Sequence, residues 1–167
     1  MSKGAYEKLV IIRSAVPTRD IGFLPGTEKE KSSVYEEPYQ AVSNELFARG
    51  DAYGILKQKS LVEFMTTSFI RGITLKHAVI LVDECQNMSF HELDSIITRV
   101  GENSKIMFCG DATQSDLIKT NEKNGIVDFM NVLRLMPSFD IIEFEVEDVI
   151  RSGLIKEYII TKMELGL

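Results

Sequence analysis

The sequence predicts an α/β fold in which a mostly parallel sheet is flanked by helices. Two apolar runs, residues 78–82 and 105–109, are typical of buried strands. The stretch between them has helical periodicity, and strand–helix–strand units of this length form parallel crossovers, which are almost always right-handed. Strand and helix patterns alternate along the rest of the chain as well, which favours a single α/β domain over residues 1–167.

The first half of the chain contributes one clear strand and one clear helix. Residues 9–12 form a short apolar run rich in β-branched side chains, and a long loop with prolines and glycines follows. Residues 34–47 have helical periodicity, and Gly50 supplies a stop signal. Residues 61–65 are compatible with either a strand or the edge of a helix.

The helix between the two central strands has marked ends. Ser89 and Glu92 form a capping-box pattern, and Gly101 stands at the expected C-terminal stop. The apolar positions between them follow the spacing of an amphipathic helix and are Leu93, Ile96, Ile97 and Val100.

The C-terminal part predicts two helices and a strand. Residues 127–136 carry apolar side chains at helical spacing, and Pro137 ends that helix. Residues 141–146 predict a fourth strand. Residues 154–163 predict a closing helix with its apolar side chains toward one side.

Composition and charge limit the class of protein. With 44% hydrophobic and 26% charged residues, a chain of 167 residues is typical of a packed domain rather than a disordered one. The net charge of −6 gives no global field that attracts nucleic acid, so any such contact has to be local. We expect no membrane segment, no signal peptide and no disulfide between the two cysteines, and therefore a cytoplasmic location.

Two neighbouring acids follow the strand of residues 78–82. Asp83 and Glu84 lie at the carboxyl edge of the predicted sheet, where open α/β folds bind ligands. In phosphoryl-transfer sites, one such acid holds Mg²⁺ through water and another orients or deprotonates the attacking water. An apolar run followed by two acids also arises by chance, so the motif needs support from a second element.

The second central strand offers that support. It ends in Gly110 and Asp111, which reach the same edge as the two acids if the strands are parallel. Gln114 follows closely, and its amide could contact a terminal phosphate or hold the hydrolytic water. The alternative is that Gly110 and Asp111 only form a turn. The convergence of polar side chains from two strands favours a ligand site.

Several ordered stretches resemble the PhoH-like family, a branch of the P-loop ATPases related to superfamily 1 helicases. The central ones are residues 81–87, residues 97–101 with Ser104 and Lys105, and residues 110–117. The others are Arg13 and residues 22–26, 69–75 and 148–151. Residues 15–20 are most similar to bacteriophage versions, and the resemblance extends from residue 9 to about 160. It implies a P-loop NTPase-like, RecA-like core.

The resemblance also implies catalytic roles. Asp83 would be the Walker B residue that binds Mg²⁺, and Glu84 would act on water. Gln114 would sense the γ-phosphate of ATP, and Arg151 is a candidate arginine finger.

Further residues are implied with less defined roles. Asp111, Arg13 and Arg71 are candidates for contact with the nucleotide, and the two arginines also for contact with nucleic acid. A lone arginine more often serves a surface ion pair, which is the alternative for both. Cys85 replaces an alanine that is common in the family, and a small apolar thiol should fit that buried position.

One departure from the family pattern matters for function. No G-x-x-x-x-G-K-[ST] pattern occurs in these residues, whereas this Walker A loop holds the β- and γ-phosphates in the family. The residues begin almost directly at the strand that follows the P-loop helix, so we expect a fragment, a separately encoded half or a version that has lost catalysis. In the related folds the missing strand lies next to the strand of residues 105–109. We expect an open strand flank there, which pairs with a Walker A segment, a full-length homologue or another copy in a homo-oligomer.

Two functions therefore remain open. The first is the Walker B part of a PhoH-like ATPase that uses ATP and Mg²⁺ once a Walker A segment completes it and acts on RNA or single-stranded nucleic acid. The second is a non-catalytic module that pairs with a full-length ATPase and regulates it. A third interpretation is an α/β domain of unrelated function.

Overall fold

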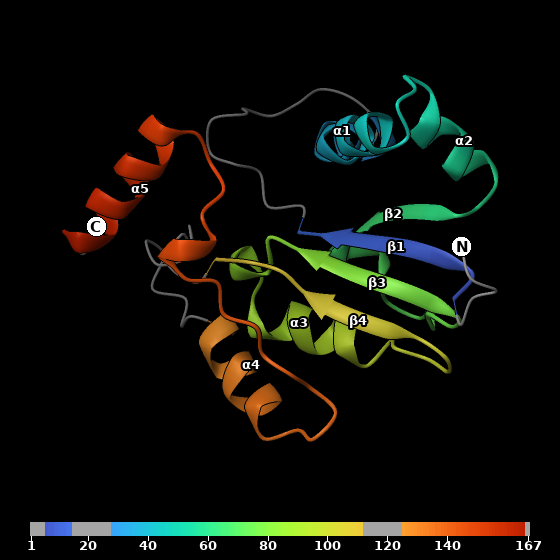
Figure 1. Ribbon diagram of the computed structural model, residues 1–167. Helices are drawn as coiled ribbons and strands as arrows, with labels where there is room; N and C mark the ends of the chain where they lie inside the picture. Colours follow the sequence, from blue (N-terminus) through green and yellow to red (C-terminus); the bar gives the residue numbers. More distant parts are fainter. Residues whose placement is uncertain (1–5, 15–27, 112–124, 166–167) are drawn as a thin grey trace. The chain divides into compact units, whose positions relative to one another are not determined.

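The computed structural model describes residues 6–14, 28–111 and 125–165 and contains a four-stranded parallel sheet (Figure 1). The strands are β1 (Lys8–Arg13), β2 (Val62–Thr66), β3 (Ala78–Asp83) and β4 (Lys105–Phe108). Their order in the sheet is β2-β1-β3-β4, and every neighbouring pair is parallel. The predicted α/β class is confirmed, and both central strands are present, although β4 has no buried residue where a buried strand was predicted.

The described residues also form helices. They are α1 (Glu28–Leu46), α2 (Ala52–Gln58), α3 (Phe90–Ile97), α4 (Gly125–Arg134) and α5 (Gly153–Glu164), with short 3-10 helices η1 (Thr67–Phe69), η2 (Cys85–Asn87) and η5 (Val146–Asp148). The chain separates into two compact units, residues 1–131 and 132–167, and each is described by itself. Within the parts that the structure describes, no helix has the length and apolar character needed to cross a membrane.

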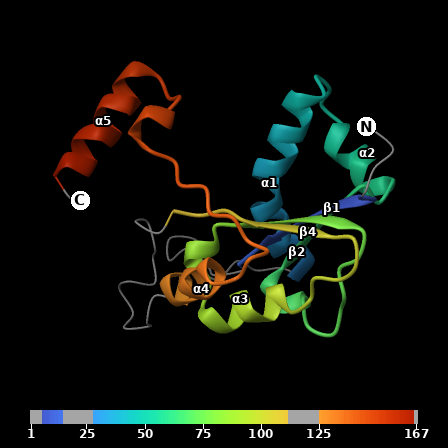
Figure 2. The same ribbon diagram turned by 60° about the horizontal axis from the view of Figure 1, so that its bottom comes forward.

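One face of the sheet is covered by α3 and the first part of α4, and we call it the closed face (Figure 2). Its side chains from β1 and β3 are fully buried and are Val10, Ile12, Ile80 and Val82. Leu93 and Ile96 of α3 are fully buried as well. Phe129 of α4 packs edge-on against Phe108 of β4, with ring centroids 4.9 Å apart. This face is the main core of the unit.

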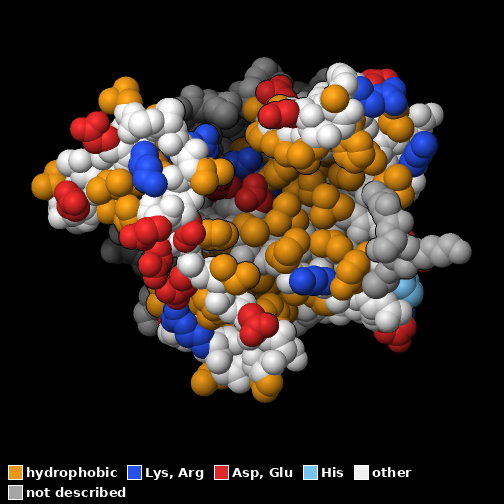
Figure 3. Space-filling model, viewed as in Figure 1, with side chains coloured by type: hydrophobic (Ala, Val, Ile, Leu, Met, Phe, Trp, Pro, Cys, Tyr) orange, Lys and Arg blue, Asp and Glu red, His pale blue; other side chains and the backbone are white. Residues whose placement is uncertain are grey.

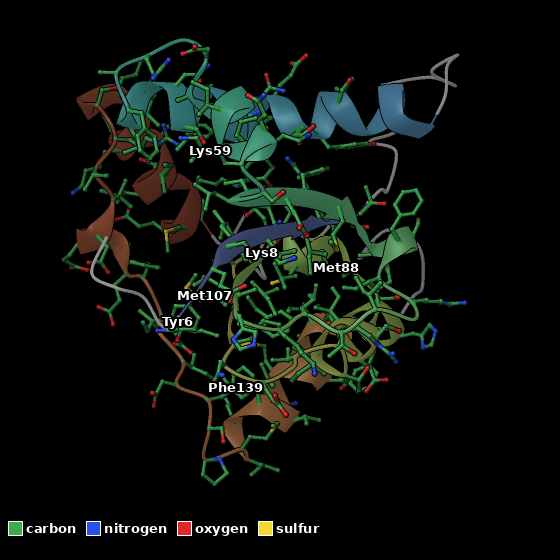
Figure 4. All side chains as sticks on the ribbon, turned by 90° about the vertical axis from the view of Figure 1, so that its right-hand side faces the viewer. Tyr6, Lys8, Lys59, Met88, Met107 and Phe139 are labelled. Atoms are coloured by element: carbon green, nitrogen blue, oxygen red, sulfur yellow. The ribbon has the colours of Figure 1, made fainter. Side chains whose placement is uncertain are left out.

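The opposite face is covered by α1 and α2 over β1 and β2, and we call it the open face (Figure 2). Ile11, Val62 and Tyr53 form a buried cluster there. Toward β4 the cover ends, because Leu81 is only partly buried and its register neighbour Met107 is 38% exposed. Figure 3 shows apolar side chains gathered on this face below α1 and α2, and Figure 4 labels Met107.

The capping box predicted for α3 is confirmed. Ser89 Oγ accepts a hydrogen bond from the Glu92 amide, and the Glu92 carboxylate accepts one from the Ser89 amide. The helix ends at Ile97, before the predicted stop at Gly101, because the chain turns to pair with the segment that precedes β3. There the Gly101 amide donates to the Leu75 carbonyl at 2.7 Å.

The fourth strand predicted over residues 141–146 is wrong. The segment is irregular and leads into η5, and Ile142 and Phe144 are 79% and 83% exposed. A strand needs a neighbour for its amides and carbonyls, and an apolar–acidic alternation does not supply one. The sheet has β2 as its remaining strand, within the residues whose pattern was compatible with either a strand or the edge of a helix. Both predicted C-terminal helices are confirmed by α4 and α5, although α5 has no buried side chain.

Candidate functional site

The carboxyl ends of β1, β3 and β4 lie at one edge of the sheet, as the parallel order requires. β1 ends at Arg13, whose register partner on β3 is Asp83. β4 runs into Gly110 and Asp111 at the same edge. We call this region the carboxyl-edge site, and it contains four of the predicted residues, Arg13, Asp83, Glu84 and Asp111.

The chain leaves β3 through a left-handed residue. Glu84 has φ +53° and ψ +39°, a backbone conformation that residues other than glycine rarely adopt. Such residues are found more often at functional sites than elsewhere. It opens the sharp turn into η2. Its Oε2 atom accepts a hydrogen bond from the Gln86 side-chain amide at 2.7 Å, so the Glu84 carboxylate is held in place.

Gln86 connects the ends of β3 and β4. Its side chain is buried, and its Oε1 atom accepts a hydrogen bond from the Asp111 amide at 3.2 Å. A Cβ on Gly110 would lie 2.4 Å from Gln86 Oε1 and 2.8 Å from Cys85 Sγ. Gly110 is therefore needed for the close approach of the two strand ends, which a turn alone does not explain. Gln86 lies in residues 81–87, one of the stretches that resemble the family, but the sequence pattern predicts no role for it.

Asp83 has a partner that the sequence did not predict. The Tyr39 hydroxyl of α1 donates a hydrogen bond to Asp83 Oδ2 at 2.5 Å. Burial, reinforced by this hydrogen bond, raises the pKa of the Tyr39 phenol well above its usual value, so the phenol remains a donor at neutral pH. The Tyr39 ring packs against Phe64. The contact of its hydroxyl with Asp83 depends on how α1 lies over the sheet, which local sequence patterns do not reveal.

The predicted arginines lie in different surroundings. The Arg13 guanidinium lies 5.9 Å from the centroid of the Tyr35 ring, beside the carboxyl-edge site. Arg71 is exposed, and its Nη2 atom lies 3.3 Å from His91 Nε2 at the beginning of α3. Nucleotide contact for either arginine remains a prediction.

Two predicted catalytic residues cannot be placed at this site. Gln114 lies outside the described residues. Arg151 lies just before α5 in the second unit, where it is exposed. Their roles remain predictions.

The two cysteines are free thiols in contrasting positions. Cys85 is buried, as the sequence predicted, and Cys109 is exposed. Burial, followed by the neighbouring Cys109 thiol, raises the pKa of Cys85 to about 12. Burial, followed by the charge of Asp83, also raises the pKa of Cys109. Cys85 therefore behaves as a small apolar side chain under the turn rather than as a nucleophile.

The carboxylates at the edge suit a magnesium ion that keeps most of its water ligands. Mg²⁺ keeps several waters and takes one or two carboxylates plus substrate phosphates. Asp83 and Glu84 supply hard oxygen ligands of this type. No group of three or more potential ligands from His, Cys, Asp and Glu occurs in the described residues, so they contain no all-protein metal cage.

Comparisons of the sequence with known proteins show the family to which the chain belongs. The family model described as PhoH-like protein matches residues 1–163. A PhoH-like protein of Bacillus subtilis (strain 168) is 32% identical over 161 residues, which are 95% of this chain and 50% of that protein. Protein PhoH of Escherichia coli (strain K12) is 31% identical over 150 residues, 89% of this chain and 42% of that protein. The chain thus spans half the length or less of these relatives. The match over nearly all of its residues shows that it belongs to the PhoH-like family, which is of the P-loop NTPase type.

Proposed function

We propose that this chain is the Walker B-containing part of a PhoH-like ATPase, which binds and hydrolyses Mg·ATP when a Walker A segment completes its site. The observation that carries the proposal is the pair of acids at the end of β3. Asp83 accepts a hydrogen bond from Tyr39, and Glu84 accepts one from Gln86, which also contacts the end of β4. A merely solvated pair of acids would not need such support.

Residues of the carboxyl-edge site, and Gln114 and Arg151 from outside it, would have separate roles in phosphoryl transfer. Asp83 would hold a magnesium ion through water, and such an ion would supply positive charge that neutralises the phosphates. Glu84 orients the attacking water and accepts its proton, while Gln86 fixes the carboxylate. Gln114 contacts the γ-phosphate, and Arg151 supplies positive charge to a nucleotide site as an arginine finger.

The open side of β4 is the place where the Walker A segment would bind. Among the described strands, β4 is the last of the sheet and pairs with β3 on one side. An edge strand is a surface to which a further strand can be added. The adjoining open face exposes apolar side chains, Met107 among them. A strand that pairs with this edge and a helix that covers this face would bury both surfaces. A second copy of the chain is the alternative occupant of the edge.

The polymer on which the ATPase acts is part of the proposal. RNA or single-stranded nucleic acid in the cytoplasm is the class implied by the resemblance. The net charge of −6 restricts any such contact to local positive groups such as Arg13 and Arg71.

Hydrolysis on mixing tests the proposed function. ATP turnover with Mg²⁺ is measured for this chain alone and after addition of the Walker A-containing part of the Bacillus subtilis relative, with Glu84→Gln as the control. We expect turnover only in the mixture and its loss in the control. If the two parts are folded and associate but show no ATP turnover, the non-catalytic regulatory module is favoured instead.

A further inference from the structure

A tyrosine from outside the family motifs contacts the predicted magnesium residue. Tyr39 lies on α1, and its hydroxyl donates to Asp83 Oδ2 across the carboxyl end of the sheet. The two residues are 44 positions apart in the sequence, so the contact depends on tertiary packing. Carboxylates that bind metals are commonly oriented by such outer hydrogen bonds.

The Tyr39 ring is fixed independently of its hydroxyl. It packs beside Phe64 of β2, with centroids 5.7 Å apart, and against the buried cluster of Ile11, Tyr53 and Val62. Because this packing holds the ring, the hydroxyl is presented to Asp83 from a rigid support. A Phe at this position would keep the packing and lose the contacts of the hydroxyl with Asp83 and Arg13.

A second aromatic residue supports the same region. Tyr35 precedes Tyr39 by one helical turn, so both side chains lie on one face of α1. The Arg13 guanidinium lies over the Tyr35 ring, and Arg13 is the register neighbour of Asp83. One face of α1 therefore reaches both charged residues at the carboxyl ends of β1 and β3.

We propose that Tyr39 is a positioning residue for magnesium binding, which holds Asp83 by Oδ2 in the orientation that accepts a water ligand of the ion. The proposal rests on the proposed function, because it takes Asp83 as the magnesium residue. Loss of an outer partner of a metal-binding carboxylate typically weakens metal affinity about 10–100-fold, and we expect about tenfold for a site in which the ion keeps most of its waters.

The chain contains a matched control for this hydrogen bond. The Tyr53 hydroxyl donates to Glu36 Oε1 at 2.7 Å, in the cluster between α1 and α2. Tyr53→Phe and Tyr39→Phe therefore each remove a phenol that donates to a carboxylate, and only Tyr39→Phe removes one from Asp83. A purely structural role of Tyr39 would make the two variants alike in metal binding.

The test uses Mn²⁺ as the probe of the magnesium site. Binding to the folded chain is followed by relaxation of water protons in the wild type, Tyr39→Phe, Tyr53→Phe and Asp83→Asn. We expect saturable binding in the wild type, loss in Asp83→Asn, about tenfold weaker binding in Tyr39→Phe and unchanged binding in Tyr53→Phe. Circular dichroism checks that each variant is folded.

A second measurement follows Mg²⁺ binding in the wild-type chain through the NMR signal of Tyr39 itself. The chain has five tyrosines and no tryptophan, so ¹³Cζ-labelled tyrosine gives a simple spectrum, in which Tyr39→Phe and Asp83→Asn both identify the Tyr39 signal. We expect Mg²⁺ to shift that signal and to leave the Tyr53 signal in place. Wild-type affinity in Tyr39→Phe, with an unmoved Tyr39 signal, would overturn the positioning role and leave the proposed function standing. Absence of any Asp83-dependent metal binding to the chain alone would likewise overturn the positioning role, whereas the proposed function is overturned by a folded, associated mixture that shows no ATP turnover.

Discussion

The closed and open faces of the sheet differ in how completely they are covered. On the closed face, side chains of β1 and β3 pack against α3 without solvent contact. On the open face, α1 and α2 cover β1 and β2, whereas Leu81 and Met107 remain partly exposed at β4, the last strand of the described sheet. Parallel sheets are normally covered on both faces. The closed face therefore maintains the fold, and the open side of β4 is a surface that further structure would bury.

The largest expected effect is a loss of stability on the closed face, compared with the same kind of substitution on the open face. Leu93→Ala removes a fully buried side chain from the closed face, and we expect it to lower the free energy of unfolding by about 2–5 kcal/mol. Leu81→Ala on the open face should cost less, because the side chain is only partly buried. Urea denaturation measures both. Equal losses would show that the two faces are packed alike.

The close approach of β3 and β4 at the carboxyl edge is tested by Gly110→Ala. The new Cβ would clash with Gln86 and Cys85, so we expect a loss of about 1–3 kcal/mol in stability and loss of ATP turnover in the completed enzyme. Thermal unfolding and the turnover assay measure these effects.

Gly54→Ala is the matched control for Gly110→Ala. No atom lies within 4 Å of a Cβ at Gly54, which is inside α2, so this change should be neutral or stabilising by about 0.5–1 kcal/mol. A Gly110→Ala variant as stable and as active as Gly54→Ala would contradict the tight junction between the strand ends.

A smaller effect is expected for a charge on the open face. Met107→Asp should lower the stability of the chain alone by only about 1 kcal/mol, because the side chain is partly exposed and Asp is a poor strand former. It should weaken binding of the Walker A segment by about tenfold or more, since that segment would otherwise bury the methionine. Titration calorimetry gives both affinities.

Leu46→Asp, at the exposed end of α1, is the control for Met107→Asp. We expect it to leave binding of the Walker A segment unchanged. If both substitutions weaken binding equally, the effect is one of net charge and the open face is not the binding surface.

The smallest effect concerns the cysteines under the carboxyl edge. At pH 8 a thiol with a pKa of about 12 is ionised in about one molecule in ten thousand, so iodoacetamide should label Cys109 and leave Cys85 untouched. Labelling of Cys85 in the native chain should require unfolding. Mass spectrometry after a short exposure measures both sites, and equal labelling would contradict the burial of Cys85.

The same shift predicts how Cys85 affects stability. In the unfolded chain the thiol ionises near pH 9, whereas in the folded chain it stays protonated until about pH 12. The unfolded state therefore binds fewer protons in this range, and stability should fall as pH rises from about 9 to about 12. Cys85→Ala should reduce this decline in urea titrations.

Local patterns in the sequence predicted the parts of the fold whose signals are local. The apolar runs of β3 and β4 and the capping box at Ser89 depend on neighbouring residues, and the structure confirms them. Residues 141–146 have a strand-like pattern but no partner strand among the described residues, so that prediction failed. β2 lacked a distinctive pattern and is a strand because it pairs with β1.

The candidate site divides in the same way. Asp83 and Glu84 could be found because they follow an apolar run, and the parallel order of the strands brings Arg13 and Asp111 to the same edge. The contacts of Tyr39 and Gln86 depend on packing between distant elements, which no local pattern specifies.

Hydrogen exchange at β4 tests the central claim most directly. Amide exchange over residues 105–108 is measured by mass spectrometry in the chain alone and with the Walker A-containing part of the Bacillus subtilis relative. We predict marked slowing of exchange at β4 on binding, while the closed face is slow in both states. Binding that protects other segments and leaves β4 unchanged would contradict the claim that the open side of β4 receives the missing part of the site.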